Sequence, residues 1–226
     1  MGNKYINQLN EQYLDVMKTI HDNSLEVGVP IIKDEGLDLL LAIINLKKPL
    51  TILEVGTAVG FSAIMMALNS SACIDTIERN KIMYQKALEN VNLLNLNERI
   101  TVYYGDAVTL ELNNLKKEYD LIFIDAAKAQ NQVFFEKYSP LLKDDGVIIT
   151  DNILFHGYVE RYYNKDLMED VSKDLRALAR KIDRFNQWLK NNKEYESHFL
   201  DIGDGMAIST KKMRWNDANL NYWLFI

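Results

Sequence analysis

The sequence predicts an α/β protein built on a doubly wound, mainly parallel sheet. Short runs rich in apolar and β-branched residues alternate with longer stretches of helical periodicity. Three of these runs are almost entirely apolar, as expected of strands that helices cover on both faces. The 226 residues contain no internal repeat and no break in composition, so we expect residues 1–226 to form a single domain.

The elements are expected in a regular order along the chain. Two helical stretches come first, at 4–22 and 34–46 within an N-terminal region of 46 residues, and Asp34 is placed to cap the second. The following strands are expected at 50–55, 73–78, 100–105, 119–125 and 146–151, separated by helices at 61–68, 80–95, 107–117 and 129–142. A long helix at 164–193 precedes a hairpin formed by 197–202 and 206–210 around "GDG", which indicates an antiparallel element at one edge.

Composition restricts the class of protein. No apolar run approaches the roughly 18 residues that span a bilayer, and the N-terminus lacks the apolar core of a signal peptide. Cys73 is the only cysteine, so an internal disulfide is excluded. The net charge of −6 argues against a protein that coats DNA. We therefore expect a cytoplasmic protein with neither DNA nor a membrane as its partner.

The loop after the first strand, "EVGTAVGFS" at 54–62, indicates a ligand site at the carboxyl ends of the strands. Gly56 permits a tight turn there, and Glu54 is a buried carboxylate that needs a partner, which a cationic ligand could supply. Glu78 lies 22 residues after Gly56 and could accept hydrogen bonds from ribose hydroxyls. It could equally begin the next helix. The "GDA" at 105–107 offers a backbone edge to an adenine ring.

Three oxygen-bearing side chains end the fourth and fifth strands. Asp125 closes one strand and Asp151-Asn152 closes the next, so we expect them to converge. Adjacent carboxylates repel each other, and a divalent cation such as Mg²⁺ would remove the conflict. Lys128 follows one turn later and could act as a general base toward a hydroxyl acidified by the metal. The alternatives are a turn or cap for Asp151-Asn152 and a salt bridge to Asp125 for Lys128.

The long helix carries a basic stripe. Its apolar residues repeat at steps of three and four on one face, and the opposite face carries Lys173, Arg176, Arg180 and Arg184. Seven Lys or Arg stand against two Asp or Glu between 173 and 193. The stripe is either a solvated face or a surface that contacts phosphates.

Together these features resemble the class I, cation-dependent O-methyltransferases that use S-adenosylmethionine, the family of the catechol and caffeoyl-coenzyme A enzymes. The matching stretches run from about residue 30 to 210: "ILEVGTAVGFSAI", "IERN", "GDA", "YDLIFIDAAK", "YSPLLKDDGVIITDNILFHGYV", "FN" at 185–186 and "GDGMAIS". "IDAAK" with "TDNILFHG" is the most specific pair. The resemblance implies a seven-stranded Rossmann-like sheet of order 3-2-1-4-5-7-6 with strand 7 antiparallel, and a homodimer.

The resemblance also implies roles for individual residues. Asp125, Asp151 and Asn152 would hold Mg²⁺ or another divalent cation, and Lys128 would be the catalytic base. The residues expected around S-adenosylmethionine are Ile31, Glu54, Gly56, Ser62, Glu78, Gly105, Asp106, Ala107 and Asp125.

Within the family, the chain is most similar overall to bacterial tRNA 5-hydroxyuridine methyltransferases. The expected reaction is therefore Mg-dependent O-methylation of 5-hydroxyuridine at the wobble position of tRNA, giving 5-methoxyuridine. The anticodon loop would contact Arg161, Lys173, Arg176, Arg180 and Arg184. The alternatives are the same chemistry on a small catechol-like or caffeoyl-coenzyme A-like phenol, a non-catalytic RNA- or adenosylmethionine-binding module, and a dehydrogenase, which the missing G-x-G-x-x-G disfavours. The tail at 213–226 extends beyond the usual end of the family and adds no chemistry that we can name.

Overall fold

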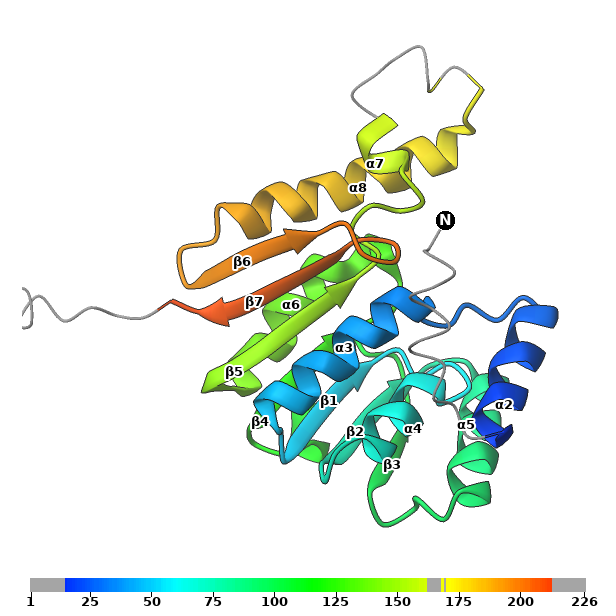
Figure 1. Ribbon diagram of the computed structural model, residues 1–226. Coiled ribbons are helices and arrows are strands. Elements are labelled where there is room, and N and C mark those ends of the chain that lie inside the picture. Colours follow the sequence, from blue (N-terminus) through cyan, green and yellow to red (C-terminus); the bar gives the residue numbers. More distant parts are fainter. Residues whose placement is uncertain (1–14, 162–167, 169, 213–226) are drawn as a thin grey trace, which may run out of the picture.

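The computed structural model describes residues 15–161, 168 and 170–212, and its centre is a seven-stranded sheet. The strand order is β3-β2-β1-β4-β5-β7-β6 (Figure 1). β7 runs antiparallel to both β5 and β6, whereas the other neighbouring strands are parallel. The α/β class, the strand order and the antiparallel hairpin are thus confirmed.

The strands and helices follow the alternation that the sequence predicts. The strands are β1 (Thr51–Val55), β2 (Cys73–Glu78), β3 (Ile100–Tyr104), β4 (Tyr119–Ile124), β5 (Leu142–Asp151), β6 (Tyr195–Leu200) and β7 (Met206–Lys211). The α-helices are α2 (Asp15–Glu26), α3 (Asp34–Lys47), α4 (Phe61–Leu68), α5 (Lys81–Leu93), α6 (Asn131–Tyr138), α7 (Tyr158–Arg161) and α8 (Lys173–Lys190). Short 3₁₀ turns are η1 (Leu112–Asn114), η2 (Lys128–Gln130) and η3 (Ser139–Leu141). Across the described residues, no helix combines the length and the apolar character needed to cross a bilayer.

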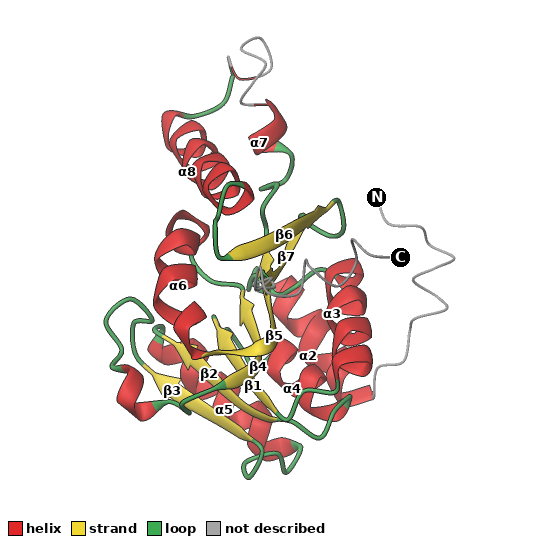
Figure 2. Ribbon diagram, turned by 90° about the vertical axis from the view of Figure 1, so that its left-hand side faces the viewer, coloured by secondary structure: helices red, strands yellow, loops and turns green. Residues whose placement is uncertain are grey.

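Helices cover both faces of the sheet (Figure 2). The buried apolar residues form a separate core on each face. One core joins α2, α3, α4 and α5 to one face, and the other joins α6 and α8 to the opposite face. Consecutive residues of a strand point to opposite faces, so Ile52 belongs to the first core and Leu53 to the second. This explains why the central strands are apolar throughout rather than alternating.

The expected helix at 107–117 is wrong, because side chains capture the carbonyl groups that a helix would need. Lys137 Nζ donates to the carbonyls of Ala107, Val108 and Leu110 at 2.6 to 2.9 Å, and the Tyr138 hydroxyl also donates to Ala107 at 2.7 Å. The segment therefore forms turns, with η1 as its only helical part. These donors lie about 30 residues away in the sequence, so local periodicity does not reveal them.

Several boundaries also differ from those expected. The long helix α8 begins at Lys173, where Ser172 caps it by accepting the Leu175 N–H; of the residues expected before it, 164–167 and 169 lie outside the described residues. Asp34 is not a cap; it lies in the first turn of α3, where its charge favours the helix dipole. The fifth strand begins at Leu142, four residues before the expected start, and the helix expected at 129–142 shortens to α6 between two 3₁₀ turns. The helix expected at 4–22 is described only from Asp15, where α2 begins. Residues 4–14 and the tail at 213–226 lie outside the described residues.

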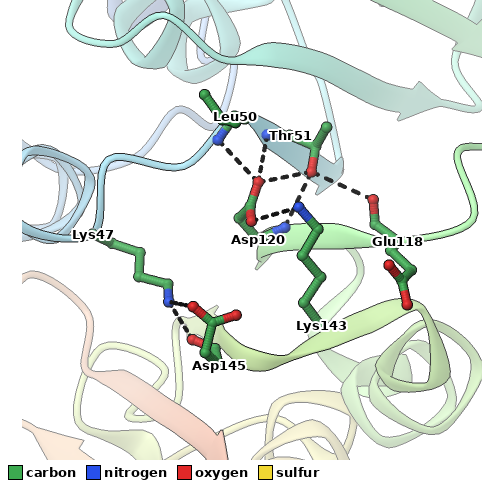
Figure 3. A network of polar contacts seen from close by, with 7 residues as sticks. All are labelled: Lys47, Leu50, Thr51, Glu118, Asp120, Lys143 and Asp145. Atoms are coloured by element: carbon green, nitrogen blue, oxygen red, sulfur yellow. Dashed lines mark hydrogen bonds and ion pairs between the residues drawn. The ribbon is translucent and has the colours of Figure 1, made fainter.

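A polar network fixes the amino ends of β1, β4 and β5 (Figure 3). One carboxylate oxygen of Asp120 accepts the backbone N–H groups of Leu50 and Thr51 at 2.9 and 2.8 Å, and the other accepts Lys143 Nζ at 2.7 Å. Burial opposes ionisation of Asp120, but the bonds from Lys143, Thr51 and Leu50 lower its pKa to about 2. Asp120 therefore links the amino ends of the three strands.

Candidate functional site

A cavity of about 450 Å³ opens at the carboxyl ends of the parallel strands. This is where ligands bind in open α/β sheets. Most of the expected site residues line it, namely Ile31, Gly56, Ser62, Glu78, Gly105, Asp106, Ala107, Asp125, Lys128 and Asn152. Glu54 and Asp151 are not among the lining residues, because both are buried behind the wall.

Gly56 is required by the protein's own backbone. Its φ is +106°, and a Cβ atom there would lie 2.1 Å from the Asp125 carbonyl oxygen. Asp125 N donates to the Val55 carbonyl at 2.9 Å, so the ends of β1 and β4 lie in direct contact at this point. The missing side chain of Gly56 therefore makes room for the backbone that follows β4, and so lets Asp125 lie at the cavity.

Glu54 is fully buried beneath the loop after β1. Its two carboxylate oxygens accept the hydroxyls of Ser62 and Thr76, each at 2.5 Å. Burial raises the pKa of Glu54 to about 7, although the two hydroxyl donors act in the opposite direction. Within the protein, the partners of Glu54 are therefore hydroxyl groups, and Ser62, unlike Glu54, lines the cavity.

Glu78 holds the two loops that border one side of the cavity. One of its oxygens accepts the Ala58 N–H at 2.8 Å, and the other accepts the Asn80 N–H at 2.7 Å. The cap of α5 is Asn80, whose side chain accepts the N–H groups of Ile82 and Met83, so Glu78 does not begin that helix. Each Glu78 oxygen keeps a lone pair that could accept a hydrogen bond from a bound hydroxyl.

Asp125 and Asp151 follow directly after paired positions of two parallel strands. Ile124 of β4 pairs with Thr150 of β5, so the next residue of each strand stands beside the other. Burial and the neighbouring negative charge of Glu54 raise the pKa of Asp125 to about 7. Burial and the charge of Asp125 likewise raise the pKa of Asp151 well above its usual range. The expected convergence of the two carboxylates is therefore present.

These groups have the chemistry of a site for a hard cation. Asn152 lies beside the pair with a φ of +62°, and its N–H donates to Asp151 Oδ1 at 2.6 Å. The described part of the chain has no group of three His, Cys, Asp or Glu side chains arranged to hold a metal. A cation here would thus use two carboxylates and the Asn152 amide. Mg²⁺ accepts such a partial set of oxygen ligands, because it keeps waters or substrate oxygens in its remaining positions.

Lys128 has a carboxylate partner that sequence reasoning missed. Its Nζ atom lies 3.4 Å from Asp204 Oδ2 and 5.4 Å from the centre of the Phe155 ring. The expected alternative of a salt bridge to Asp125 is therefore replaced by an ion pair with Asp204. Asp204 stands in the "GDG" turn between β6 and β7, which in a sequence indicates only a hairpin. Its contact with Lys128 spans 76 positions of the chain.

The basic stripe of α8 is exposed to solvent. Lys173, Arg176, Arg180 and Arg184 lie on one face, while Ala179, Ile182, Phe185 and Leu189 are buried on the other. α8 packs against α7, which carries the exposed Arg161, and against η2, which carries Lys128. The stripe therefore belongs to a helix that packs against η2, one of the segments that line the cavity.

Comparison with known proteins assigns this architecture to a family of O-methyltransferases. The model of an O-methyltransferase family matches residues 4–212. Tapetum-specific methyltransferase 1 of Arabidopsis thaliana is 31% identical over 193 residues, covering 83% of this chain and 79% of that protein. A caffeoyl-CoA O-methyltransferase of Populus kitakamiensis is 27% identical over 188 residues, covering 80% and 77%. The crystal structure of a candidate caffeoyl-CoA O-methyltransferase from Staphylococcus aureus superposes with a TM-score of 0.85 at 37% identity, covering 92% of this chain and 98% of that one.

The raised pKa of Glu54 predicts a pH-dependent effect of Glu54→Gln. The folded-state pKa of about 7 lies above the roughly 4.3 of an unfolded glutamate, so the stability of the fold falls as the pH rises through this interval and levels off above about pH 7. Glutamine avoids this and can still bond both hydroxyls. We expect the variant to gain about 2 kcal/mol relative to the natural protein between pH 5 and pH 8.

Chemical denaturation of the ligand-free protein at the two pH values measures this gain. Glu98→Gln, at an exposed site, is the matched control and should show no such trend. If Glu54→Gln changed the free energy of unfolding by the same amount at pH 5 and pH 8, the raised pKa of Glu54 would be contradicted.

Proposed function

The chain belongs to the O-methyltransferase family and is of the caffeoyl-CoA type. For this enzyme we propose methyl transfer to the O5 atom of 5-hydroxyuridine in tRNA. The methyl donor is S-adenosylmethionine, and the product is 5-methoxyuridine at the wobble position. The observation that carries the choice of RNA is the exposed basic face of α8, a helix that packs against the η2 turn, which lines the cavity.

We assign the donor to the part of the cavity between β1, β2 and β3. The free lone pairs of Glu78 suit the ribose hydroxyls, and Gly105, Asp106 and Ala107 border the space that an adenine ring would take. Ile31 and Ser62 line the same cavity, and we assign the methionine end to them. In this arrangement Glu54 acts on the donor only through Ser62.

The acceptor would bind where β4 and β5 end. Asp125, Asp151 and Asn152 would hold a divalent cation, which when bound would neutralise the two carboxylates and make an adjacent hydroxyl more acidic. 5-Hydroxyuridine offers two neighbouring oxygens, O5 and the O4 carbonyl, as a catechol does. The same set of side chains therefore suits either substrate.

Lys128 would serve as the general base. The amine acts in its neutral form, since the ammonium group of an ion pair has no lone pair to accept a proton. It takes the proton of the O5 hydroxyl, and an oxygen lone pair forms the new bond to the methyl carbon. The carbon–sulfur bond breaks at the same time, and S-adenosylhomocysteine leaves with the electron pair on sulfur. The protein contributes mainly by holding the donor, the acceptor and the amine in line.

The charge of α8 favours an RNA substrate. The whole chain carries a net charge of −6, yet Lys173–Lys190 contains six Lys or Arg against two Asp. Basic residues gathered on one face of an acidic protein are typical of a surface that contacts phosphates. The base of an anticodon loop is unpaired and can enter a cavity, while the flanking phosphates remain outside on such a surface.

A small phenol is the second candidate acceptor. The names of the relatives from Populus kitakamiensis and Staphylococcus aureus refer to caffeoyl-CoA, and a catechol-like phenol carries the same pair of adjacent oxygens. A small acceptor makes no use of the basic face of α8, and this difference separates the two candidates.

Deleting the gene should change one nucleoside of tRNA. Mass spectrometry of hydrolysed tRNA is expected to show loss of 5-methoxyuridine and accumulation of 5-hydroxyuridine. The natural gene should reverse both changes, whereas Lys128→Ala or Asp125→Ala should not, because each removes a group needed for proton removal or acceptor binding. Lys86→Ala, at an exposed position of α5, should restore the product fully. Unchanged 5-methoxyuridine in the deletion strain would exclude tRNA as the substrate, and full rescue by Lys128→Ala would exclude the mechanism.

Charge reversal on α8 should weaken tRNA binding selectively. For Arg176→Glu with Arg180→Glu we expect KM for tRNA to rise about tenfold or more at 0.1 M salt, because favourable phosphate contacts become repulsive. KM for S-adenosylmethionine should stay within about twofold, because these side chains lie outside the cavity. Initial rates of methyl transfer to tRNA measure both.

The matched control reverses two exposed lysines of α5, Lys81→Glu with Lys86→Glu. An equal rise in KM for tRNA in both double variants would show that the effect comes from the net charge of the protein and not from the basic face of α8. An unchanged KM in the α8 variant would show that the basic face is a solvated surface.

A further inference from the structure

Asp204 joins four separate segments at the mouth of the cavity. Its Oδ1 atom accepts the His156 N–H at 2.5 Å and lies 3.3 Å from His156 Nδ1 and 3.8 Å from Lys33 Nζ. Its Oδ2 atom faces Lys128 Nζ at 3.4 Å. The Asp204 carbonyl also accepts the Leu154 N–H at 3.0 Å. One residue thus ties its own hairpin turn to the turn before α3, the η2 turn and the segment after β5.

The burial of Asp204 is greater than its place in a hairpin turn suggests. Its exposed fraction is 3%, whereas Asp201, three residues earlier in the same connection, is exposed. A buried carboxylate destabilises a protein unless it is paired. Here Lys33, Lys128 and His156 supply the pairing, and Asp204 in turn adds a negative charge near Asp125 and Asp151.

Asp204 also holds a backbone segment in an uncommon conformation. Asn152, Phe155 and His156 have φ values of +62°, +49° and +52°, which non-glycine residues rarely adopt. Such conformations persist where surrounding contacts enforce them. The Asp204 carboxylate and carbonyl bind the N–H groups of His156 and Leu154, so they fix the segment that begins with Asn152.

We infer that Asp204 is a positioning residue for methyl transfer, which holds the Lys128 amine and the segment 152–157 in register with each other. This inference rests on the proposed function, since it assigns Lys128 the role of base. Asp125 and Asp151 are the proposed cation ligands, so Asp204 is the carboxylate that remains to orient the amine. A base that is itself oriented by a third group is a general feature of such sites. Once Lys128 has accepted the proton, the carboxylate also stabilises the resulting ammonium group.

Asp204→Asn separates the two tasks of the carboxylate. The amide oxygen can still accept the His156 N–H, so the segment is retained, but the negative charge facing Lys128 is lost. With the full-length protein and tRNA we expect kcat to fall about tenfold or more. KM for S-adenosylmethionine and for tRNA should stay within about twofold, because the substitution removes no contact from either binding surface. Asp204→Glu keeps the charge and should recover part of kcat, and Asp201→Asn is the matched control.

A double variant tests whether Asp204 acts through Lys128. In single-turnover experiments, Asp204→Asn should lower the rate of the natural protein but not the residual rate of Lys128→Ala, because residues that act as a unit are not additive. A merely structural role would lower both rates by the same factor.

The possible failures can be told apart. Full activity of Lys128→Ala would overturn the proposed mechanism itself. An inactive Lys128→Ala together with a natural kcat in Asp204→Asn would overturn only the role of Asp204. Equal loss in both backgrounds, or melting temperatures of Asp204→Asn and Asp204→Glu more than about 10 °C below that of Asp201→Asn, would assign Asp204 to the stability of the fold instead.

Discussion

The repulsion between two buried carboxyl groups, those of Asp125 and Asp151, is the constraint around which this site is built. Parallel pairing of β4 and β5 sets the two groups side by side. Burial and the charge of Glu54 raise the pKa of Asp125, and burial and the charge of Asp125 raise the pKa of Asp151. Such an arrangement destabilises an empty protein, so it is retained for what it binds. A divalent cation relieves the repulsion, and the Asn152 amide, the Lys128 amine and the Asp204 carboxylate are arranged around the same point.

The fold delivers these groups by fixing the strands at both ends. At the amino ends, Asp120 ties β1 to β4 and β5 through backbone and lysine donors. At the carboxyl ends, the missing side chain of Gly56 lets the Asp125 backbone approach β1. Two apolar cores hold the sheet between them, and the β6–β7 hairpin brings Asp204 to the cavity from outside the parallel part of the sheet.

The sequence predicted the sheet and most of the cavity, because both depend on local patterns. Apolar runs mark the buried strands, and polar residues that end such runs must meet at one edge of the sheet. Long-range contacts explain what it did not predict. Lys137 prevents a helix at 107–117 from about 30 residues away. Two hydroxyls on other elements satisfy Glu54, and Asp204 reaches Lys128 across 76 positions.

The response of thermal stability to Mg²⁺ tests the central claim most directly. In the natural protein at pH 8, millimolar Mg²⁺ should raise the melting temperature, because the ion binds only the folded carboxylate pair. Asp151→Asn removes the repulsion, so without metal it should melt at or above the natural temperature, and it should lose the response to Mg²⁺. An equal rise in both proteins, or no rise in the natural one with Mg²⁺ or Mn²⁺, would contradict the account.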